Sequence, residues 1–124
     1  MYTILLVDDE NINHIIAKRI LRDEGKLVSV FSGEKALKKL SEEEAPDLIL
    51  MDIIMPGMSG MDTCRAIRKE EALKDIPLIF LTAKDDAETE AACLAEGAKG
   101  FVRKPFSPEE LTRIIRDTLG QEDA

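Results

Sequence analysis

The chain has 124 residues, which fits one domain, and 44% of them are hydrophobic, which is enough to form a core. Its formal net charge of −8 argues against nucleic acid as a direct partner, because phosphate binding needs a basic surface. No apolar run approaches the ~18 residues of a membrane span. The N-terminus lacks the pattern of a signal peptide, so we expect a cytoplasmic protein without membrane contact.

Apolar runs alternate with helical patterns in the first half of the chain. The run 4–7 precedes a helical pattern over 11–22, which Gly25 is expected to end. The apolar positions of this helix are Ile12, Ile15, Ile16 and Ile20. Residues 27–31 alternate between apolar and polar, which predicts an edge strand. A helix over 34–43, capped by Ser32, then leads to a third apolar run at 48–52.

The same alternation continues in the second half. Ser59 and Asp62 have the spacing of a capping box, at the start of a helix that fades near residue 71. The fourth apolar run, 77–81, precedes a helix predicted from Asp85 to Gly97. Its apolar positions are Ala91, Ala92, Leu94 and Ala95. A short fifth run, 100–102, precedes a strong helix start at 107–110, where Ser107 is the cap and Pro108 follows it.

Five successive strand–helix units predict an α/β domain with a doubly wound parallel sheet of five strands and helices on both faces. We expect this domain to cover residues 1–120, with 121–124 as a frayed tail and no effector domain in the chain. In such sheets, sites form beyond the C-terminal ends of the strands, where the strand order reverses. The order 2-1-3-4-5 would make the first and third strands neighbours at that point.

Polar residues stand at the ends of four of the apolar runs. Asp8 and Asp9 follow the first run, Asp52 ends the third, Thr82 follows the fourth and Lys104 comes after the fifth. Three carboxylates in one pocket repel one another and need a cation, and oxygen ligands with room for water suit Mg²⁺. Lys104 and Thr82 opposite them would hold a tetrahedral anion. The pattern therefore predicts phosphoryl transfer to Asp52.

Each of these residues alone is equally well explained by a structural role, as a helix cap, a turn residue or a surface lysine. Their joint occurrence at strand ends, in this order, favours a site. The one histidine, His14, is predicted to lie on the surface of the first helix. Cys64 and Cys93 lack the spacing of a metal site, so we expect reduced, partly buried thiols.

Four short motifs carry a resemblance to a known family. They are Val7-Asp8-Asp9-Glu10, Met51-Asp52-Ile53 with Met55-Pro56-Gly57, Leu81-Thr82-Ala83-Lys84, and Lys104-Pro105-Phe106. In order and spacing, residues 2 to about 119 resemble the receiver domain of a bacterial two-component response regulator, of the chemotaxis-regulator kind, whose fold is flavodoxin-like.

This resemblance implies a phosphorylation switch rather than an enzyme with a substrate of its own. Asp52 would accept a phosphoryl group from a phosphohistidine on a sensor histidine kinase or phosphotransfer protein. Asp9, Asp52 and the backbone carbonyl of Ile54 would bind Mg²⁺, or Mn²⁺ in its place. Asp8 would act mostly through metal-bound water, and Lys104 would pair with the phosphoryl group.

The resemblance also implies how the signal would leave the site. Thr82 and Phe101 would move together, and the bond between Lys104 and Pro105 would be cis. The face made by the fourth helix, the fifth strand and the fifth helix would then change its binding to a downstream protein or an output domain. A simple core role is the alternative for Phe101.

Other functions stay open on the same fold. A flavodoxin-like cofactor binder would hold FMN, but the acidic first loop and the 4% aromatic content make a flavin site unexpected. A docking receiver without phosphorylation would not need all five site residues. A phosphatase with an aspartate nucleophile would need a general acid at the position of Ile54. Ile54 and Lys84 stand where the family tunes the lifetime of the phosphoryl group, so that lifetime is not predicted.

Overall fold

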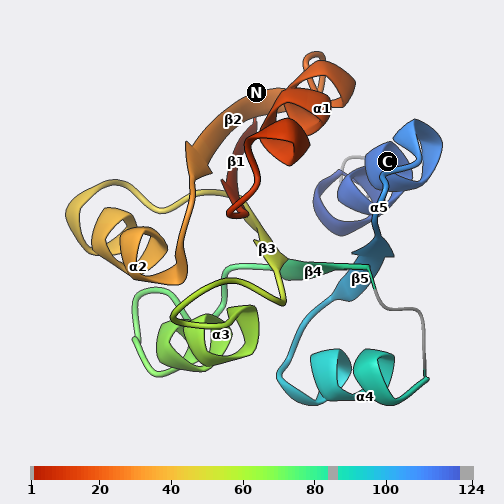
Figure 1. Ribbon diagram of the computed structural model, residues 1–124. Helices are drawn as coiled ribbons and strands as arrows, with labels where there is room; N and C mark the ends of the chain where they lie inside the picture. Colours follow the sequence, from red (N-terminus) through yellow and green to blue (C-terminus); the bar gives the residue numbers. More distant parts are fainter. Residues whose placement is uncertain (1, 84–86, 121–124) are drawn as a thin grey trace.

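The computed structural model describes residues 2–83 and 87–120, in which strands and helices alternate (Figure 1). In chain order the elements are β1 (Tyr2–Val7), α1 (Asn11–Ile20), β2 (Gly25–Val30), α2 (Gly33–Glu42), β3 (Leu48–Asp52), α3 (Gly60–Arg68), β4 (Leu78–Thr82), α4 (Ala87–Ala95), β5 (Gly100–Arg103) and α5 (Pro108–Leu119). The predictions for Lys84, for a helix start at Asp85 and for the tail 121–124 fall outside these residues.

The five strands form one parallel sheet in the order β2-β1-β3-β4-β5. Val7 at the end of β1 lies beside Val30 of β2 and Met51 of β3, and Asp52 lies beside Leu81 of β4. The predicted fold class and strand order are therefore confirmed. This register brings the C-terminal ends of β1, β3 and β4 to one edge of the sheet, with β1 and β3 as neighbours at the reversal of strand order.

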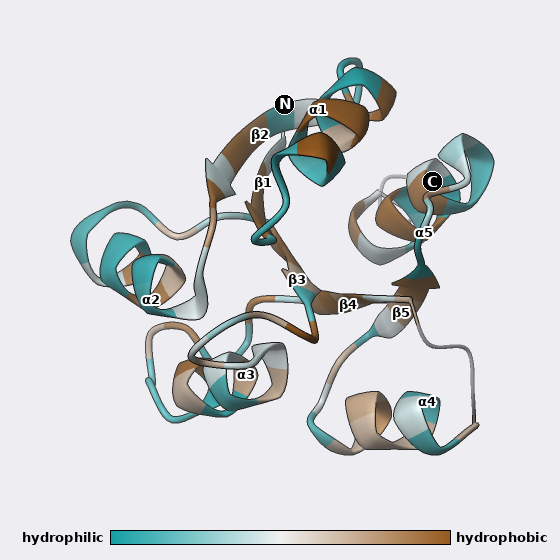
Figure 2. Cartoon of the chain, in the orientation of Figure 1, coloured by the Kyte–Doolittle hydropathy of each residue, from teal (hydrophilic) through white to brown (hydrophobic). Residues whose placement is uncertain are grey.

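Helices cover both faces of the sheet, so each strand contributes alternate residues to two cores (Figure 1). On the α1 and α5 side, strand residues such as Leu6 and Leu50 pack with Ala17 and Leu111. On the α2, α3 and α4 side, strand residues such as Val7 and Phe80 belong to a separate core cluster. β3 and β4 are buried along their whole length, and Figure 2 shows the hydrophobic colour of β4 at the centre of the molecule.

Three helices begin at the serine caps predicted from the sequence. The hydroxyl of Ser32 accepts a hydrogen bond from the backbone N–H of Lys35, and Ser59 and Ser107 accept the equivalent bonds at α3 and α5. Pro108 occupies the first turn of α5, where its missing N–H costs nothing. The caps therefore fix the residues at which these three helices begin.

The apolar face predicted for the first helix is wrong at Ile12 and Ile15, whereas Ile20 is half-buried and packs against the core as expected. The buried residues of α1 are Asn13, His14 and Ala17, whereas Ile12 and Ile15 are 57% and 47% exposed. Polar contacts with the end of β1, described below, turn the helix so that Asn13 and His14 face the sheet. Gly25 was expected to end this helix, but α1 ends at Ile20 and Gly25 is the first residue of β2.

The apolar positions predicted for the fourth helix are wrong too. Cys93 is the buried residue that α4 contributes, whereas Leu94 is 50% exposed and the three predicted alanines are exposed. Alanine is too small to orient a helix by burial, so the larger thiol of Cys93 reaches the core. Cys64 and Cys93 are both free thiols in the same core cluster. Among the described helices, none has the length and apolarity to span a bilayer.

Candidate functional site

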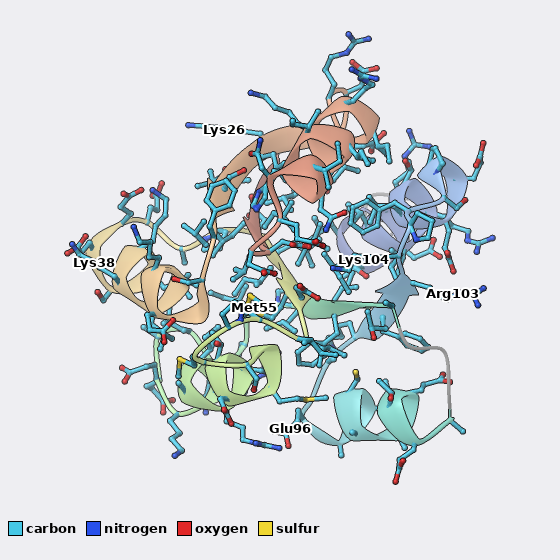
Figure 3. All side chains as sticks on the ribbon, viewed as in Figure 1. Lys26, Lys38, Met55, Glu96, Arg103 and Lys104 are labelled. Atoms are coloured by element: carbon cyan, nitrogen blue, oxygen red, sulfur yellow. The ribbon has the colours of Figure 1, made fainter. Side chains whose placement is uncertain are left out.

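A pocket of about 300 Å³ opens at the C-terminal edge of the sheet. Its lining residues are Asp9, Glu10, Asp52, Ile54, Thr82, Ala83 and Lys104. They come from the ends of strands and the loops that follow them, as the strand order requires. Figure 3 shows Lys104 pointing from the end of β5 into the molecule, while the neighbouring Arg103 points outwards.

The three predicted carboxylates come together beside this pocket. One oxygen from each of Asp8, Asp9 and Asp52 lies within 4.8 Å of the other two. Asp8 and Asp52 are buried and Asp9 is exposed, so the cluster is closed on one side and open to solvent on the other. Oxygen ligands in this number and arrangement fit Mg²⁺, which keeps several waters.

Lys104 supplies the positive charge of the cluster. Its Nζ lies 3.2 Å from Oδ2 of Asp8 and 3.1 Å from Oδ1 of Asp52. Burial lowers the pKa of the Lys104 ammonium, but the charges of Asp52 and Asp8 outweigh burial and raise it overall. Lys104 is therefore charged at neutral pH, and one ammonium faces three carboxylates.

The excess of negative charge affects the pKa of Asp52. Burial first, and the charge of Asp8 second, raise the pKa of Asp52 from 3.8 to about 6, against the opposing influence of Lys104. Lys104 thus neutralises only part of the negative charge of the cluster, and the remaining negative charge favours a bound cation.

Asp8 is held by groups on both sides. The backbone N–H of Glu10 donates to Oδ1 of Asp8 at 2.9 Å, and Nδ2 of Asn13 donates to Oδ2 at 3.1 Å. The N–H of Asp8 donates to the carbonyl of Val30 at 3.3 Å. Sequence reasoning missed Asn13. Its signal was a polar residue within a helical apolar pattern, five positions after Asp8.

The loop after β3 is pressed against Asp52. A Cβ on Gly60 would lie 2.0 Å from the backbone oxygen of Asp52, so only glycine lets α3 begin this close to the strand. The N–H of Gly60 donates to the carbonyl of Ile53 at 2.8 Å and closes the loop. Within that loop Met55 is buried, whereas Ile54 is 65% exposed and lines the pocket.

Thr82 and Lys104 are joined through the backbone. Thr82 is buried at the end of β4, and its carbonyl accepts a hydrogen bond from the N–H of Lys104 at 2.8 Å. The peptide bond between Lys104 and Pro105 is cis. Phe101 is half-buried and packs against the core on the α2, α3 and α4 side. Phe101 does not line the pocket. In the β4–β5 register Thr82 lies beside Arg103, and Phe101 is two residues before Arg103.

The surface position predicted for His14 is wrong. The ring is 4% exposed, with Nε2 2.7 Å from the carbonyl oxygen of Asp8 and Nδ1 2.8 Å from Oγ of Ser29. Its centroid lies 4.1 Å from that of Phe31. Both ring nitrogens have partners, so burial costs little. The sequence did not indicate this role, because Ile12 and Ile15 suggested a different buried face for the helix.

Comparisons with known proteins agree with this geometry. The family model described as "Response regulator receiver domain" matches residues 4–116. The DNA-binding response regulator MtrA of Mycobacterium tuberculosis is 37% identical over 121 residues, which cover 97% of this chain and 51% of MtrA. The chain thus spans about half the length of the curated relatives it matches.

Solved structures of similar shape carry the same kind of domain. The chemotaxis protein CheY4 of Vibrio cholerae has a TM-score of 0.88 and 30% identity, over 96% of this chain and 99% of that one. The receiver domain of the sensor histidine kinase PA1611 from Pseudomonas aeruginosa has a TM-score of 0.85 and 32% identity, over 97% and 98% of the two chains. That structure has a magnesium ion coordinated in its active site cleft.

Proposed function

The chain belongs to the response regulator receiver domain family of two-component signalling, and on that premise we propose that Asp52 is its phosphoacceptor. The observation that carries the proposal is the position of the Asp52 carboxylate, 3.1 Å from the Lys104 ammonium and clustered with Asp8 and Asp9. The domain would extend over residues 1–120.

The chemistry asks for a carboxylate that can attack phosphorus. An oxygen of Asp52 would form the new P–O bond as the P–N bond of a phosphohistidine breaks, and the leaving imidazole would take a proton from water. Lys104 opposes the rise in the pKa of Asp52 and so helps to keep the nucleophile ionised. After the transfer, the Lys104 ammonium and the Thr82 hydroxyl would hold the phosphoryl oxygens.

Receiver domains bind Mg²⁺, as the PA1611 domain does. We assign Asp9, Asp52 and the backbone carbonyl of Ile54 as direct ligands in this chain, with Asp8 acting through bound water. The clustering of the three carboxylates supports this assignment. When bound, the ion supplies positive charge that offsets the negative charge developing between the carboxylate and the phosphoryl group. The same oxygen ligands suit Mn²⁺.

The signal would leave through β4 and β5. A phosphoryl group on Asp52 would draw Lys104 from Asp8 and the Thr82 hydroxyl towards the new oxygens, and Phe101 would turn inwards as Thr82 moves. That local change would bias the face formed by α4, β5 and α5 between two arrangements.

The proposed partners are proteins of the cytoplasm. A histidine kinase or phosphotransfer protein would supply the phosphoryl group, and a downstream protein or an output domain would receive the signal. MtrA is named as DNA-binding, but it is about twice as long as this chain. With a net charge of −8, these 124 residues would act on proteins rather than on nucleic acid. Apart from its own phosphorylation and dephosphorylation, the chain would catalyse no reaction.

Phosphorylation by acetyl phosphate, a small phosphodonor, tests whether the chain is a phosphoacceptor. The protein is incubated with Mg²⁺ and acetyl phosphate, and its intact mass is measured. We expect one added phosphoryl group, lost on treatment with hydroxylamine and absent when EDTA removes the metal. A protein that gains no phosphoryl group from acetyl phosphate, phosphoramidate or a phosphorylated kinase would contradict the proposal.

A further inference from the structure

We infer that His14 is a positioning residue for the acidic cluster, because it fixes the backbone at Asp8 and with it the direction of the Asp9 carboxylate. The inference rests on the proposed function of the cluster as a Mg²⁺ site. His14 lies outside the lining of the pocket, and its contact with the acidic cluster is the hydrogen bond to the backbone carbonyl of Asp8.

The contacts of His14 determine which ring nitrogen carries the proton. Nε2 lies 2.7 Å from the carbonyl oxygen of Asp8, and a carbonyl oxygen only accepts hydrogen bonds, so Nε2 must donate. In the neutral ring Nδ1 is then an acceptor, and it faces the Ser29 hydroxyl at 2.8 Å. Ser29 and Phe31 thus hold the ring from the β2 side while Nε2 holds Asp8.

The Asp8 carbonyl needs this donor because of where it lies. Asp8 follows directly after Val7, the last residue of β1, where the strand ladder ends, and the residue is fully buried. A buried carbonyl without a donor costs free energy and would turn towards another donor or water. That turn would rotate the peptide between Asp8 and Asp9, and the Asp9 carboxylate would leave the position that brings it within 4.8 Å of the other two.

Side-chain geometry offers a matched set of variants. Glutamine at position 14 keeps an N–H donor near the place of Nε2, whereas asparagine reaches only the place of Nδ1. Phenylalanine keeps the aromatic ring beside Phe31 but has no donor. Ile15→Ala is the control, since Ile15 is 47% exposed on the same helix.

The first measurement is Mg²⁺ affinity by titration calorimetry, at a temperature at which each variant is folded. We expect His14→Asn and His14→Phe to bind Mg²⁺ about tenfold more weakly, the lower end for residues that hold metal ligands. His14→Gln and Ile15→Ala should stay close to wild type. A role in stability alone would lower the unfolding temperature of all three His14 variants without this split in affinity.

The second measurement needs no variant. Nitrogen NMR of the wild-type ring at alkaline pH should show the neutral form protonated at Nε2. A ring protonated at Nδ1, or Mg²⁺ affinities of His14→Asn and His14→Phe equal to wild type, would overturn the inference and leave the proposed function standing. A wild-type protein that binds no Mg²⁺ would overturn both.

Discussion

The ammonium of Lys104 and the carboxylate of Asp52 meet across an intervening strand: Nζ lies 3.1 Å from Oδ1, although β4 separates β3 from β5. The same ammonium lies 3.2 Å from Asp8, at the end of β1. One side chain therefore ties the ends of three strands together, and its removal would leave two buried carboxylates without their positive partner.

Lys104→Met should destabilise the metal-free protein by about 3 kcal/mol, because breaking a buried ion pair leaves an uncompensated charge. Urea unfolding in EDTA measures the change. Lys99→Met is the matched control, since Lys99 is exposed just before β5. Equal stability of the two variants would show that Lys104 does not neutralise the cluster. Lys104→Met should also lose phosphorylation by acetyl phosphate.

Asp52 makes the stability of the metal-free protein depend on pH. Folding raises its pKa from 3.8 to about 6, so the folded state holds its proton more tightly than the unfolded state. Stability from this group is therefore greatest below pH 4 and falls as pH rises through about 6. At roughly 1.4 kcal/mol per pKa unit, Asp52→Asn should be up to about 3 kcal/mol more stable than wild type at neutral pH.

Urea unfolding of wild type and Asp52→Asn between pH 4 and pH 8, in EDTA, checks this dependence. The two proteins should converge at the acid end of the range and separate as the pH rises. A gap that stays constant with pH would assign the stability change to packing instead of charge.

Magnesium should remove most of the stability difference between these two proteins. An ion that binds only the folded state adds about 2.7 kcal/mol at a concentration of 100 times its Kd. Wild type should gain this stability in Mg²⁺, whereas Asp9→Asn and Asp52→Asn should gain much less. Asp117→Asn, on the exposed surface of α5, should respond as wild type does. Thermal unfolding with and without Mg²⁺ measures all four.

Gly60→Ala should destabilise the fold by about 3 kcal/mol, the upper end for overpacking, because its Cβ would lie 2.0 Å from the backbone oxygen of Asp52. Gly100→Ala provides the comparison, since its Cβ would meet the flexible end of Ile114 at 3.0 Å. Chemical unfolding of both variants ranks them. A milder effect at Gly60 than at Gly100 would mean that the loop after β3 moves freely against Asp52.

The site could be predicted because the parallel sheet does the placing. Each of Asp8, Asp52 and Thr82 directly follows or ends an apolar run, and strand order then determines which ends meet. The roles of Asn13 and His14 could not be predicted in this way. Their burial depends on hydrogen bonds to Asp8, which turn α1 against its own apolar pattern.

The buried face of α4 could not be predicted from the sequence either, for a different reason. Its apolar residues are mostly alanines, whose burial contributes too little to choose a face, and the helix turned Cys93 rather than Leu94 to the core. Caps were easier to predict, since Ser59 and Ser107 act within one turn of backbone and need no tertiary information.

The assignment of Asp52 as the phosphoacceptor is tested most directly by mapping the phosphoryl group to a residue. Wild type, Asp52→Ala and the exposed control Asp62→Ala are each incubated with Mg²⁺ and acetyl phosphate, then measured by intact mass and peptide mapping. We predict one phosphoryl group in wild type and Asp62→Ala, on the peptide that contains Asp52, and none in Asp52→Ala. A phosphoryl group retained by Asp52→Ala, or mapped to another residue in wild type, would contradict the account.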